Sequence, residues 1–230
     1  MSADTYRQPT ILLVHGAWHG AWCWGKLIPE LESRGWDVAT VDLPSASAEA
    51  EHPAGMHDDA KVIREKLAAI DGPVAVVAHS YGGIPATEAA AKANNVSRLI
   101  YLAAFQLEEG DSLASQSGGA LPSGETGTLP PNPEHREYFY NGVTDEDAAW
   151  AAEQLVPQSI KSFSEPLTAT AWKNVESRYI VCELDNALPL QFQQGLAARS
   201  GKSYQLPAGH SAFLSLPAEL AETIAVALLD

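Results

Sequence analysis

The ten residues VAVVAHSYGG, 74–83, constrain the fold of this chain most. Their first five residues form an uninterrupted apolar run, which is typical of a strand buried on both faces. The helical sequence YGGIPATEAAAKAN begins directly behind Ser80. Because a sharp strand-to-helix turn needs small residues on both sides, as Ala78 and Gly82 are, the pattern predicts that Ser80 has strained backbone geometry and presents its hydroxyl above the sheet.

Strand and helix patterns alternate along most of the chain. Near-continuous apolar strands that alternate with helices predict an α/β fold with a mostly parallel sheet and helices on both faces. The length of 230 residues suits one such domain. The expected strands are 11–14, 36–43, 74–78, 96–105, 177–184 and 203–207, and the expected helices are 24–35, 56–72, 81–94, 188–201 and 217–229.

The alternation stops between residues 106 and 164. The stretch SQSGGALPSGETGTLPPNP is rich in Gly, Pro and Ser, which is typical of a mobile loop. The stretch TDEDAAWAAEQLVP behind it reads as a helix, with Thr144 and Asp147 in the spacing of a capping box. We therefore predict a core of residues 1–105 and 165–230, with 106–164 as a small helical lid inserted between its fourth and fifth strands.

The charge balance disfavours some partners. Asp and Glu number 29 against 14 Lys and Arg, which gives a formal net charge of −15. Such an acidic surface repels phosphate backbones and anionic lipids, so neither nucleic acid nor a membrane is expected as a partner. The polar beginning of the sequence and its two cysteines, Cys23 and Cys182, favour a reducing, cytoplasmic location.

A serine hydroxyl becomes a good nucleophile only when a base takes its proton. Behind a turn of this type, the acid and the base follow in the order Ser, Asp or Glu, His. Asp185 follows the fifth expected strand and His210 follows the sixth. Because the carboxyl ends of parallel strands meet at one edge of a sheet, Ser80, Asp185 and His210 are predicted as the catalytic residues, with Glu183 as the alternative acid. The competing interpretations are a helix N-cap for Asp185 and an ordinary surface histidine for His210.

The loop HGAWHGAWCW follows the first strand and reaches the same edge of the sheet. Acyl transfer needs two backbone N–H donors for the oxyanion, one directly after the nucleophile and one from an early loop of this kind. The amides of Tyr81 and Ala17 are predicted as these donors. Gly16 is expected to give the backbone the freedom to aim the Ala17 amide.

Three tryptophans in one loop need a reason, because soluble proteins rarely expose large apolar patches. We expect Trp18 near a pocket and Trp22 and Trp24 packed beneath it, with plain core packing as the alternative for each. The aromatic side chains of the predicted lid are those of Tyr138, Phe139, Tyr140 and Trp150. They either line an acyl pocket or form the lid's own core. The residues predicted to contact substrate are Trp18, His79, Phe105, Tyr138 and Trp150.

Two other kinds of site are less well supported. Gly16 and Gly20 behind a strand resemble a dinucleotide-binding turn, but the indoles of Trp18 and Trp22 would crowd the phosphates. The evidence for a metal site is also weak, because acidic residues in the first turn of a helix are explained by their favourable interaction with the helix dipole. The residues considered for it are His52, His57, Asp58 and Asp59. We expect no metal and no organic cofactor.

Several segments together resemble one known family: LLVHGAWHGAWCW, AHSYGG, YLAAF, RYIVCELDNALP and AGHSAFLSLPAEL. They are similar to α/β-hydrolases, in particular to plant methyl-ester esterases, hydroxynitrile lyases and their bacterial esterase relatives. The similarity covers nearly the whole chain and is weakest at 106–164. It implies the α/β-hydrolase fold, with Ser80 as nucleophile, His210 as base, Asp185 as its orienting acid, and the Ala17 and Tyr81 amides as oxyanion donors.

The departures from the lyases in that family favour ester hydrolysis. Those lyases carry a threonine just after the first strand's histidine and a lysine just after the catalytic histidine, where this chain has Gly16 and Ser211. We therefore expect a serine carboxylesterase that hydrolyses small, fairly apolar esters through an acyl-enzyme. The alternatives are a lyase or a carbon–carbon or lactone hydrolase with the same triad, and a ligand receptor without turnover. A small-molecule ester is the expected partner. The sequence leaves open whether the protein forms a homodimer.

Overall fold

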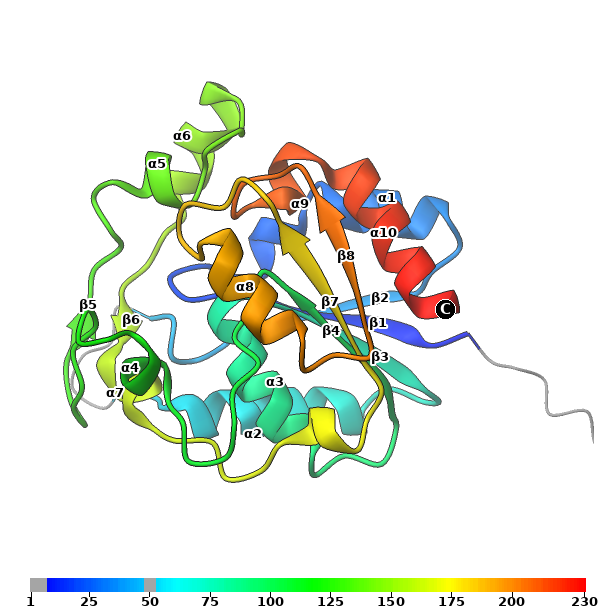
Figure 1. The fold of residues 1–230 in the computed structure, drawn as a ribbon, viewed down its shortest axis with the longest axis horizontal. Helices are drawn as coiled ribbons and strands as arrows, with labels where there is room; N and C mark the ends of the chain where they lie inside the picture. The colour runs from blue at the N-terminus through cyan, green and yellow to red at the C-terminus, as the bar shows by residue number, and fades with distance from the viewer. Residues whose placement is uncertain (1–7, 48–52) are drawn as a thin grey trace, which may run out of the picture.

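The computed structural model describes residues 8–47 and 53–230. Within them, a parallel sheet of six strands has the order β2-β1-β3-β4-β7-β8 (Figure 1). The reversal of strand order between β1 and β3 creates a switch point, where loops at the carboxyl ends of the strands leave room for a site. The strands are β1 (Thr10–Val14), β2 (Val38–Val41), β3 (Val74–His79), β4 (Val96–Leu102), β7 (Ser177–Cys182) and β8 (Lys202–Leu206).

Helices cover both faces of this sheet. Successive strand residues alternate between the two sides, so Leu12 joins one core cluster and Leu13 the other. One face packs against α2 (Met56–Ala68), α3 (Gly83–Ala90) and α8 (Leu190–Ala197), and the other against α1 (Leu27–Ser33) and α10 (Pro217–Leu229). The predicted fold class, a mostly parallel sheet with helices on both faces, is confirmed.

Some element bounds differ from the sequence prediction. The expected strand 36–43 is shorter, because β2 begins at Val38 and ends at Val41. The expected helix 24–35 starts later, since residues 21–24 form a separate 3-10 turn, η1 (Ala21–Trp24). Gly35 follows α1 with a φ of 84°, the left-handed conformation that ends helices and favours glycine.

Residues 106–164 contribute nothing to the large sheet. They form short elements that lie outside it (Figure 1): α4 (Leu113–Gln116), β5 (Thr128–Leu129), α5 (His135–Tyr138), α6 (Asp145–Glu153), β6 (Gln158–Ser159) and α7 (Ile160–Ser164). β5 and β6 pair antiparallel. The hydroxyl of Thr144 caps α6 by accepting from the Asp147 amide at 3.2 Å. The remaining described elements are the 3-10 turns η2 (Ser80–Gly82) and η3 (Ala171–Lys173) and the short helix α9 (Ala212–Ser215).

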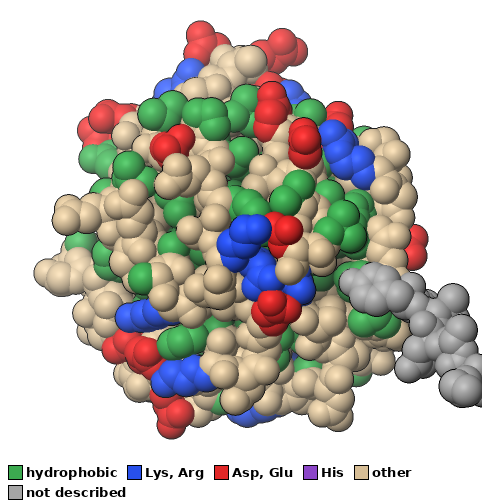
Figure 2. Space-filling model, turned by 45° about the vertical axis from the view of Figure 1, so that its right-hand side comes forward, with side chains coloured by type: hydrophobic (Ala, Val, Ile, Leu, Met, Phe, Trp, Pro, Cys, Tyr) green, Lys and Arg blue, Asp and Glu red, His purple; other side chains and the backbone are tan. Residues whose placement is uncertain are grey.

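The surface mixes charges of both signs. On the face seen in Figure 2, basic and acidic side chains lie next to one another and hydrophobic side chains are scattered among them. Two of the ion pairs on the protein are Arg178–Glu176 and Lys202–Asp230. Within 8–47 and 53–230, no helix combines the length and apolar character that crossing a membrane requires.

Candidate active site

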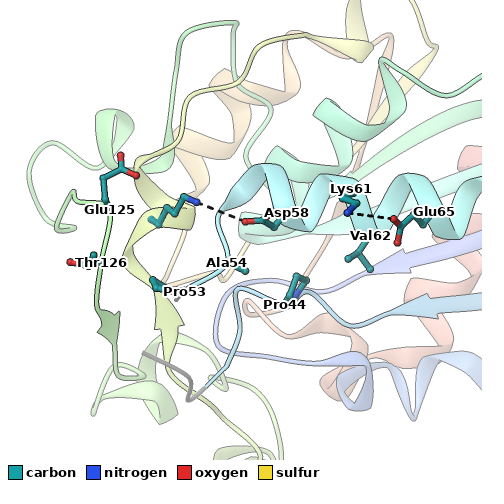
Figure 3. Close-up of a pocket in the computed structure, with 10 residues that line it drawn as sticks. Pro44, Pro53, Ala54, Asp58, Lys61, Val62, Glu65, Glu125 and Thr126 are labelled. Carbon is teal, nitrogen blue, oxygen red and sulfur yellow. Dashed lines mark ion pairs between the residues drawn. The ribbon is translucent and has the colours of Figure 1, made fainter. Parts of the chain in front are cut away.

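One open groove, of about 600 Å³, lies beside α2 and is lined mostly by charged side chains and prolines (Figure 3). Its charges pair with one another, Lys161 with Asp58 at 3.9 Å and Lys61 with Glu65 at 4.0 Å. None of the predicted catalytic residues lines it. This groove is therefore not the place where the predicted chemistry meets a substrate.

A second cavity, of about 660 Å³, opens at the carboxyl edge of the sheet. Ser80 and His210 line it, together with Ala17 and Tyr81, the residues predicted to donate to an oxyanion. The four come from loops behind three different strands, β1, β3 and β8. The sheet thus brings residues that are far apart in sequence to one cavity.

Ser80 stands on a sharp turn between β3 and the η2–α3 helix. Its φ is 52°, in the left-handed region that a non-glycine residue adopts at a cost of about 1–3 kcal/mol. The close approach of helix and neighbouring loops needs glycine behind it, because a Cβ at Gly82 would lie 2.3 Å from the His15 carbonyl oxygen. A Cβ at Gly83 would lie 2.5 Å from the carbonyl oxygen of Phe105. The turn that was expected from the small residues is present, with the Ser80 side chain at the cavity.

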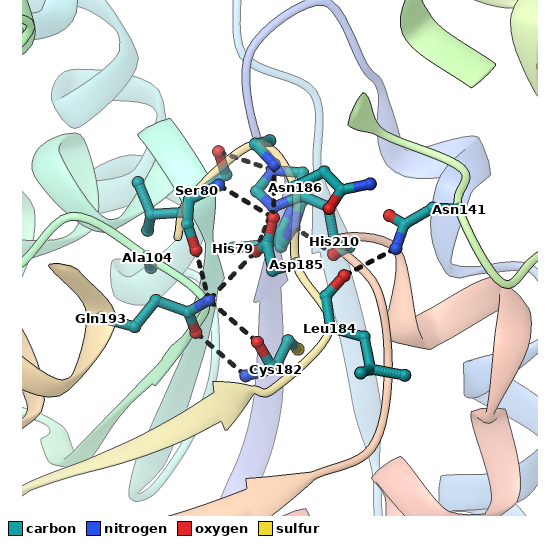
Figure 4. A network of polar contacts seen from close by, with 12 residues as sticks. His79, Ser80, Ala104, Asn141, Cys182, Leu184, Asp185, Asn186, Gln193 and His210 are labelled. Atoms are coloured by element: carbon teal, nitrogen blue, oxygen red, sulfur yellow. Dashed lines mark hydrogen bonds and ion pairs between the residues drawn. The ribbon is translucent and has the colours of Figure 1, made fainter. Parts of the chain in front are cut away.

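Ser80, His210 and Asp185 form a chain of hydrogen bonds (Figure 4). His210 Nδ1 lies 2.7 Å from Asp185 Oδ2, and His210 Nε2 lies 3.1 Å from Ser80 Oγ. The carboxylate can only accept, so in the neutral imidazole the proton is on Nδ1 and the Nε2 lone pair faces the serine. This arrangement can remove the proton of the Ser80 hydroxyl as that oxygen attacks.

The Asp185 carboxylate is held by its own loop and by one glutamine. Its Oδ1 accepts from the amides of Ala187 and Leu188, both at 2.8 Å. Gln193 donates to Oδ2 at 3.3 Å and also bonds both backbone groups of Cys182 (Figure 4). The alternative acid, Glu183, is exposed and has no part in this chain. Sequence reasoning missed Gln193, because only the packing of α8 on β7 reveals its role.

His79 lies behind the site and does not line the cavity, in contrast to its predicted role in substrate contact. Its side chain is buried, and Nε2 donates to the His210 carbonyl oxygen at 3.0 Å. Burial lowers the pKa of His79 well below its ordinary value, so the ring is neutral. The physical reason for the difference is that His79 is the last residue of β3 and continues the side of Ala75 and Val77. Its ring therefore packs against Trp24 and Phe213, whereas Ser80 lies beyond the strand in the turn.

Two histidines fix the loop behind β1. His15 Nδ1 donates to the Gly16 carbonyl at 2.8 Å, and His19 Nδ1 donates to the Ala17 carbonyl at 2.8 Å. The carbonyl and the N–H of one trans peptide point in opposite directions, so holding the Gly16 oxygen sets the direction of the Ala17 N–H. Burial lowers the pKa of both histidines, that of His19 to about 3, which keeps them neutral in these roles.

Gly16 acts through space rather than through backbone freedom. It is not among the glycines with positive φ, so it does not use the left-handed conformation that glycine adopts at little cost. A Cβ at this position would lie 2.9 Å from the Cβ of Ser80 and 3.0 Å from Nδ1 of His79. Glycine is therefore required because the loop passes directly beside Ser80.

The three loop tryptophans have three different environments. Trp18 lines the cavity and stacks on Phe139, whereas Trp24 is fully buried against Phe213. Trp22 is only half-buried, but it packs against the core cluster that contains Trp24 and stacks on His19 at 5.3 Å. It contacts Trp150 edge to face at 5.4 Å. Trp150 is 45% exposed and does not line the cavity, so its predicted contact with substrate is not supported.

The cavity wall is mostly apolar. The predicted contact residues Phe105 and Tyr138 line it, as does Phe139, whereas Tyr140 is buried and its hydroxyl donates to His19 Nε2 at 3.1 Å. The aromatic residues of 106–164 thus serve both of the roles left open. Sequence reasoning missed these further wall residues: Leu113, Gln116, Ser117, Ala120, Leu121, Leu129, Pro130, Pro131, Asn132, Pro133, Ala187, Leu188, Pro189 and Phe192.

The two acids at the start of α2 differ in function. Asp58 accepts from the Gly55 amide at 2.8 Å and fits the helix-terminus interpretation. Asp59 instead is fully buried and accepts from Tyr81 Oη at 2.6 Å and from the Ser45 amide at 2.9 Å. Burial raises the pKa of Asp59 to about 7. Among the described residues no cluster of His, Cys, Asp and Glu could hold a metal ion, and His52 lies outside them.

The fold and this site define the class of protein. The sequence profile of the alpha/beta hydrolase family matches residues 11–223, so the chain belongs to the alpha/beta hydrolase family. It is 29% identical to a carbendazim hydrolyzing esterase of Nocardioides sp. (strain SG-4G), over 93% of this chain and 97% of that protein. It is 30% identical to the pFDCC methylesterase MES16 of Arabidopsis thaliana, over 96% of this chain and 95% of that one.

Solved structures agree with this assignment. The crystal structure of the Arabidopsis methylesterase MES16 superposes with a TM-score of 0.83 at 28% identity, and covers 96% of this chain and 99% of its own. The predicted resemblance to plant methyl-ester esterases and bacterial esterases is thereby confirmed.

Proposed function

We propose that the protein is a serine carboxylesterase. The observation that carries the proposal is the hydrogen-bonded chain from Asp185 through His210 to Ser80, which ends at the wall of a cavity large enough for an organic ester. Relatives that are named esterases and methylesterases support the same reaction class. Residues 106–164 act as the lid that closes this cavity on the side away from the sheet.

In the first half-reaction, Ser80 Oγ attacks the ester carbonyl carbon while His210 Nε2 accepts its proton. The Ala17 and Tyr81 amides stabilise the oxyanion that forms, and each well-aimed donor contributes about 3 kcal/mol to the barrier reduction. The carbon–oxygen bond to the alcohol then breaks, and His210 returns its proton to the departing alkoxide oxygen. In the second half-reaction water attacks the acyl-enzyme, His210 takes a proton from it, and the acid leaves as Ser80 recovers its own.

The cavity favours neutral esters with a bulky apolar part. None of the described side chains lining it is an Asp, Glu, Lys or Arg, so a charged substrate would find no partner there. A volume of about 660 Å³ lies within the range of sites for drug-sized ligands, which supports the expected small, fairly apolar ester. The relatives named as methylesterases support methanol as the alcohol product.

The alternatives have less support. Ser211 is buried where the lyases have lysine, so no ammonium stands there to hold a departing cyanide. A receptor without turnover would not need the complete chain of hydrogen bonds to Ser80. The cytoplasm remains our proposal for the location of the protein, in keeping with two free, buried cysteines. Association of two copies remains a prediction.

The proposal is tested by hydrolysis of neutral p-nitrophenyl esters. Ser80→Ala should lower kcat by on the order of 10⁶-fold and Asp185→Asn by on the order of 10⁴-fold, because these remove the nucleophile and the tautomer control. Glu183→Gln is the matched control, since it neutralises an exposed acid two residues away, and should leave kcat unchanged. Retention of most of the activity by Ser80→Ala, or faster turnover of cyanohydrins than of esters by the wild type, would contradict the proposal.

A further inference from the structure

The lid holds Trp18 through three polar atoms. The Trp18 amide donates to Gln158 Oε1 at 3.0 Å, and the indole Nε1 donates to the Leu129 carbonyl at 3.0 Å. The Trp18 carbonyl accepts from the Val156 amide at 3.0 Å. Trp18 directly follows Ala17, whose amide is one of the two proposed oxyanion donors. The lid therefore contacts the backbone of the oxyanion loop itself as well as the cavity.

The peptide between Ala17 and Trp18 is fixed at both ends. Its oxygen accepts from His19 Nδ1 at 2.8 Å, and its N–H donates to Gln158. Trp18 has a φ of 62°, an unfavourable backbone conformation for any residue other than glycine. Such a conformation persists only when surrounding contacts enforce it. Gln158 supplies one of these contacts, from a position 140 residues further along the chain.

Further hydrogen bonds connect the side-chain amide of Gln158 to Tyr81, the residue of the second proposed oxyanion donor. Gln158 is fully buried, and its Nε2 donates to Ser45 Oγ at 2.7 Å and to Ser162 Oγ at 2.8 Å. Ser45 Oγ in turn donates to the Asp59 carboxylate, which also accepts from Tyr81 Oη at 2.6 Å. One buried chain of hydrogen bonds therefore joins the residue behind one proposed donor to the residue that carries the other.

We propose that Gln158 is a positioning residue for the oxyanion hole, and that through it the lid fixes the aim of the Ala17 and Tyr81 amides. This inference rests on the proposed esterase function. Gln158 does not line the cavity and touches no reacting atom, so it acts only through the backbone of Trp18 and the side chain of Tyr81. Oxyanion stabilisation in this protein then depends on a docked lid.

The test is Gln158→Met, which keeps the length of the side chain and removes its hydrogen bonds. The kcat for a p-nitrophenyl ester, counted per active site titrated with a fluorophosphonate, should fall about 10- to 100-fold, because a small misalignment of catalytic groups has effects of that size. KM should change by less than about threefold, since the cavity wall is intact. A merely structural residue would lower the melting temperature and the fraction of active sites but leave kcat per site unchanged.

The matched control is Gln154→Met, which makes the same exchange four residues earlier in the lid, outside the cavity and the buried chain. It should leave kcat and KM as in the wild type. Should Gln158→Met fail to fold, Gln158→Asn provides the same test, because it keeps a buried amide but withdraws it from Trp18. Its kcat per site should also fall.

The inference is overturned if the kcat per site of the folded Gln158 variant stays within about twofold of wild type, or if only KM changes. Failure of the proposed function has a different signature. If the proposed function is wrong, Ser80→Ala keeps its activity. If only the role of Gln158 is wrong, Ser80→Ala is inactive and the Gln158 variants behave like the wild type.

Discussion

The proposed catalytic residues and the wall of the cavity are built in different ways. Ser80 stands one residue beyond β3, Asp185 three beyond β7 and His210 four beyond β8. Each is therefore placed by the hydrogen-bond ladder of a continuous parallel sheet. Much of the wall comes instead from 106–164, where the only strands are β5 and β6, of two residues each, and the helices are short.

This difference separates chemistry from selectivity. Short connections from a rigid sheet leave the triad little freedom, which suits groups that must meet within hydrogen-bond distance. The wall depends on side-chain packing between distant segments, such as Trp18 on Phe139 and Phe163. We expect substitutions at the sheet edge to change kcat for every ester, and substitutions in the lid to change which esters bind.

The first prediction concerns the pH dependence of stability. It tests the buried junction between core and lid, where Asp59 and Gln158 both bond Ser45. Asp59 has a pKa of about 7 in the folded protein against an ordinary 3.8, because burial disfavours its charged form. Between these values the folded state binds the proton and the unfolded state does not, so stability falls as pH rises toward 7. Relative to Asp59→Asn, the wild type should lose about 2–3 kcal/mol of unfolding free energy between pH 5 and pH 8.

Urea unfolding of both proteins at the two pH values measures this difference directly. Asp58→Asn is the matched control, because it removes a charge from the neighbouring, exposed side chain, and the loss seen in wild type should persist in it. An equal loss between pH 5 and pH 8 in Asp59→Asn would show that the buried carboxyl does not link the junction to pH.

A smaller effect is expected from filling the cavity on its lid side. Leu121 lines the cavity, so Leu121→Trp should raise KM for a bulky p-nitrophenyl ester about tenfold by steric exclusion. Hydrolysis of p-nitrophenyl acetate should hardly change, because the acetyl group needs little of the cavity. Steady-state kinetics with both esters distinguishes the two.

Ala149→Trp adds the same side chain to the exposed surface of α6, outside the cavity, and should leave both esters unaffected. If Leu121→Trp lowers kcat/KM for p-nitrophenyl acetate as much as for the bulky ester, the lid side of the cavity serves the chemistry and not only the selection of substrate.

The same contrast explains what the sequence could predict. Strand positions follow from apolar runs, and the triad stands directly behind strands, so Ser80, Asp185 and His210 could be placed at one edge from local patterns alone. The hydrogen bonds of Gln158 and Gln193 could not be predicted from the sequence, because a glutamine has no local sequence signature and its partners are distant in sequence. His79 and Trp150 were assigned to the substrate by residue type, which does not reveal the direction of a side chain.

The most direct test of the account is covalent labelling of the wild type with a fluorophosphonate, followed by peptide mapping. We expect one phosphonyl group per chain on Ser80, loss of esterase activity in proportion to the label, and no uptake of label by Ser80→Ala. Labelling at another residue, or full activity in a chain labelled at Ser80, would contradict it.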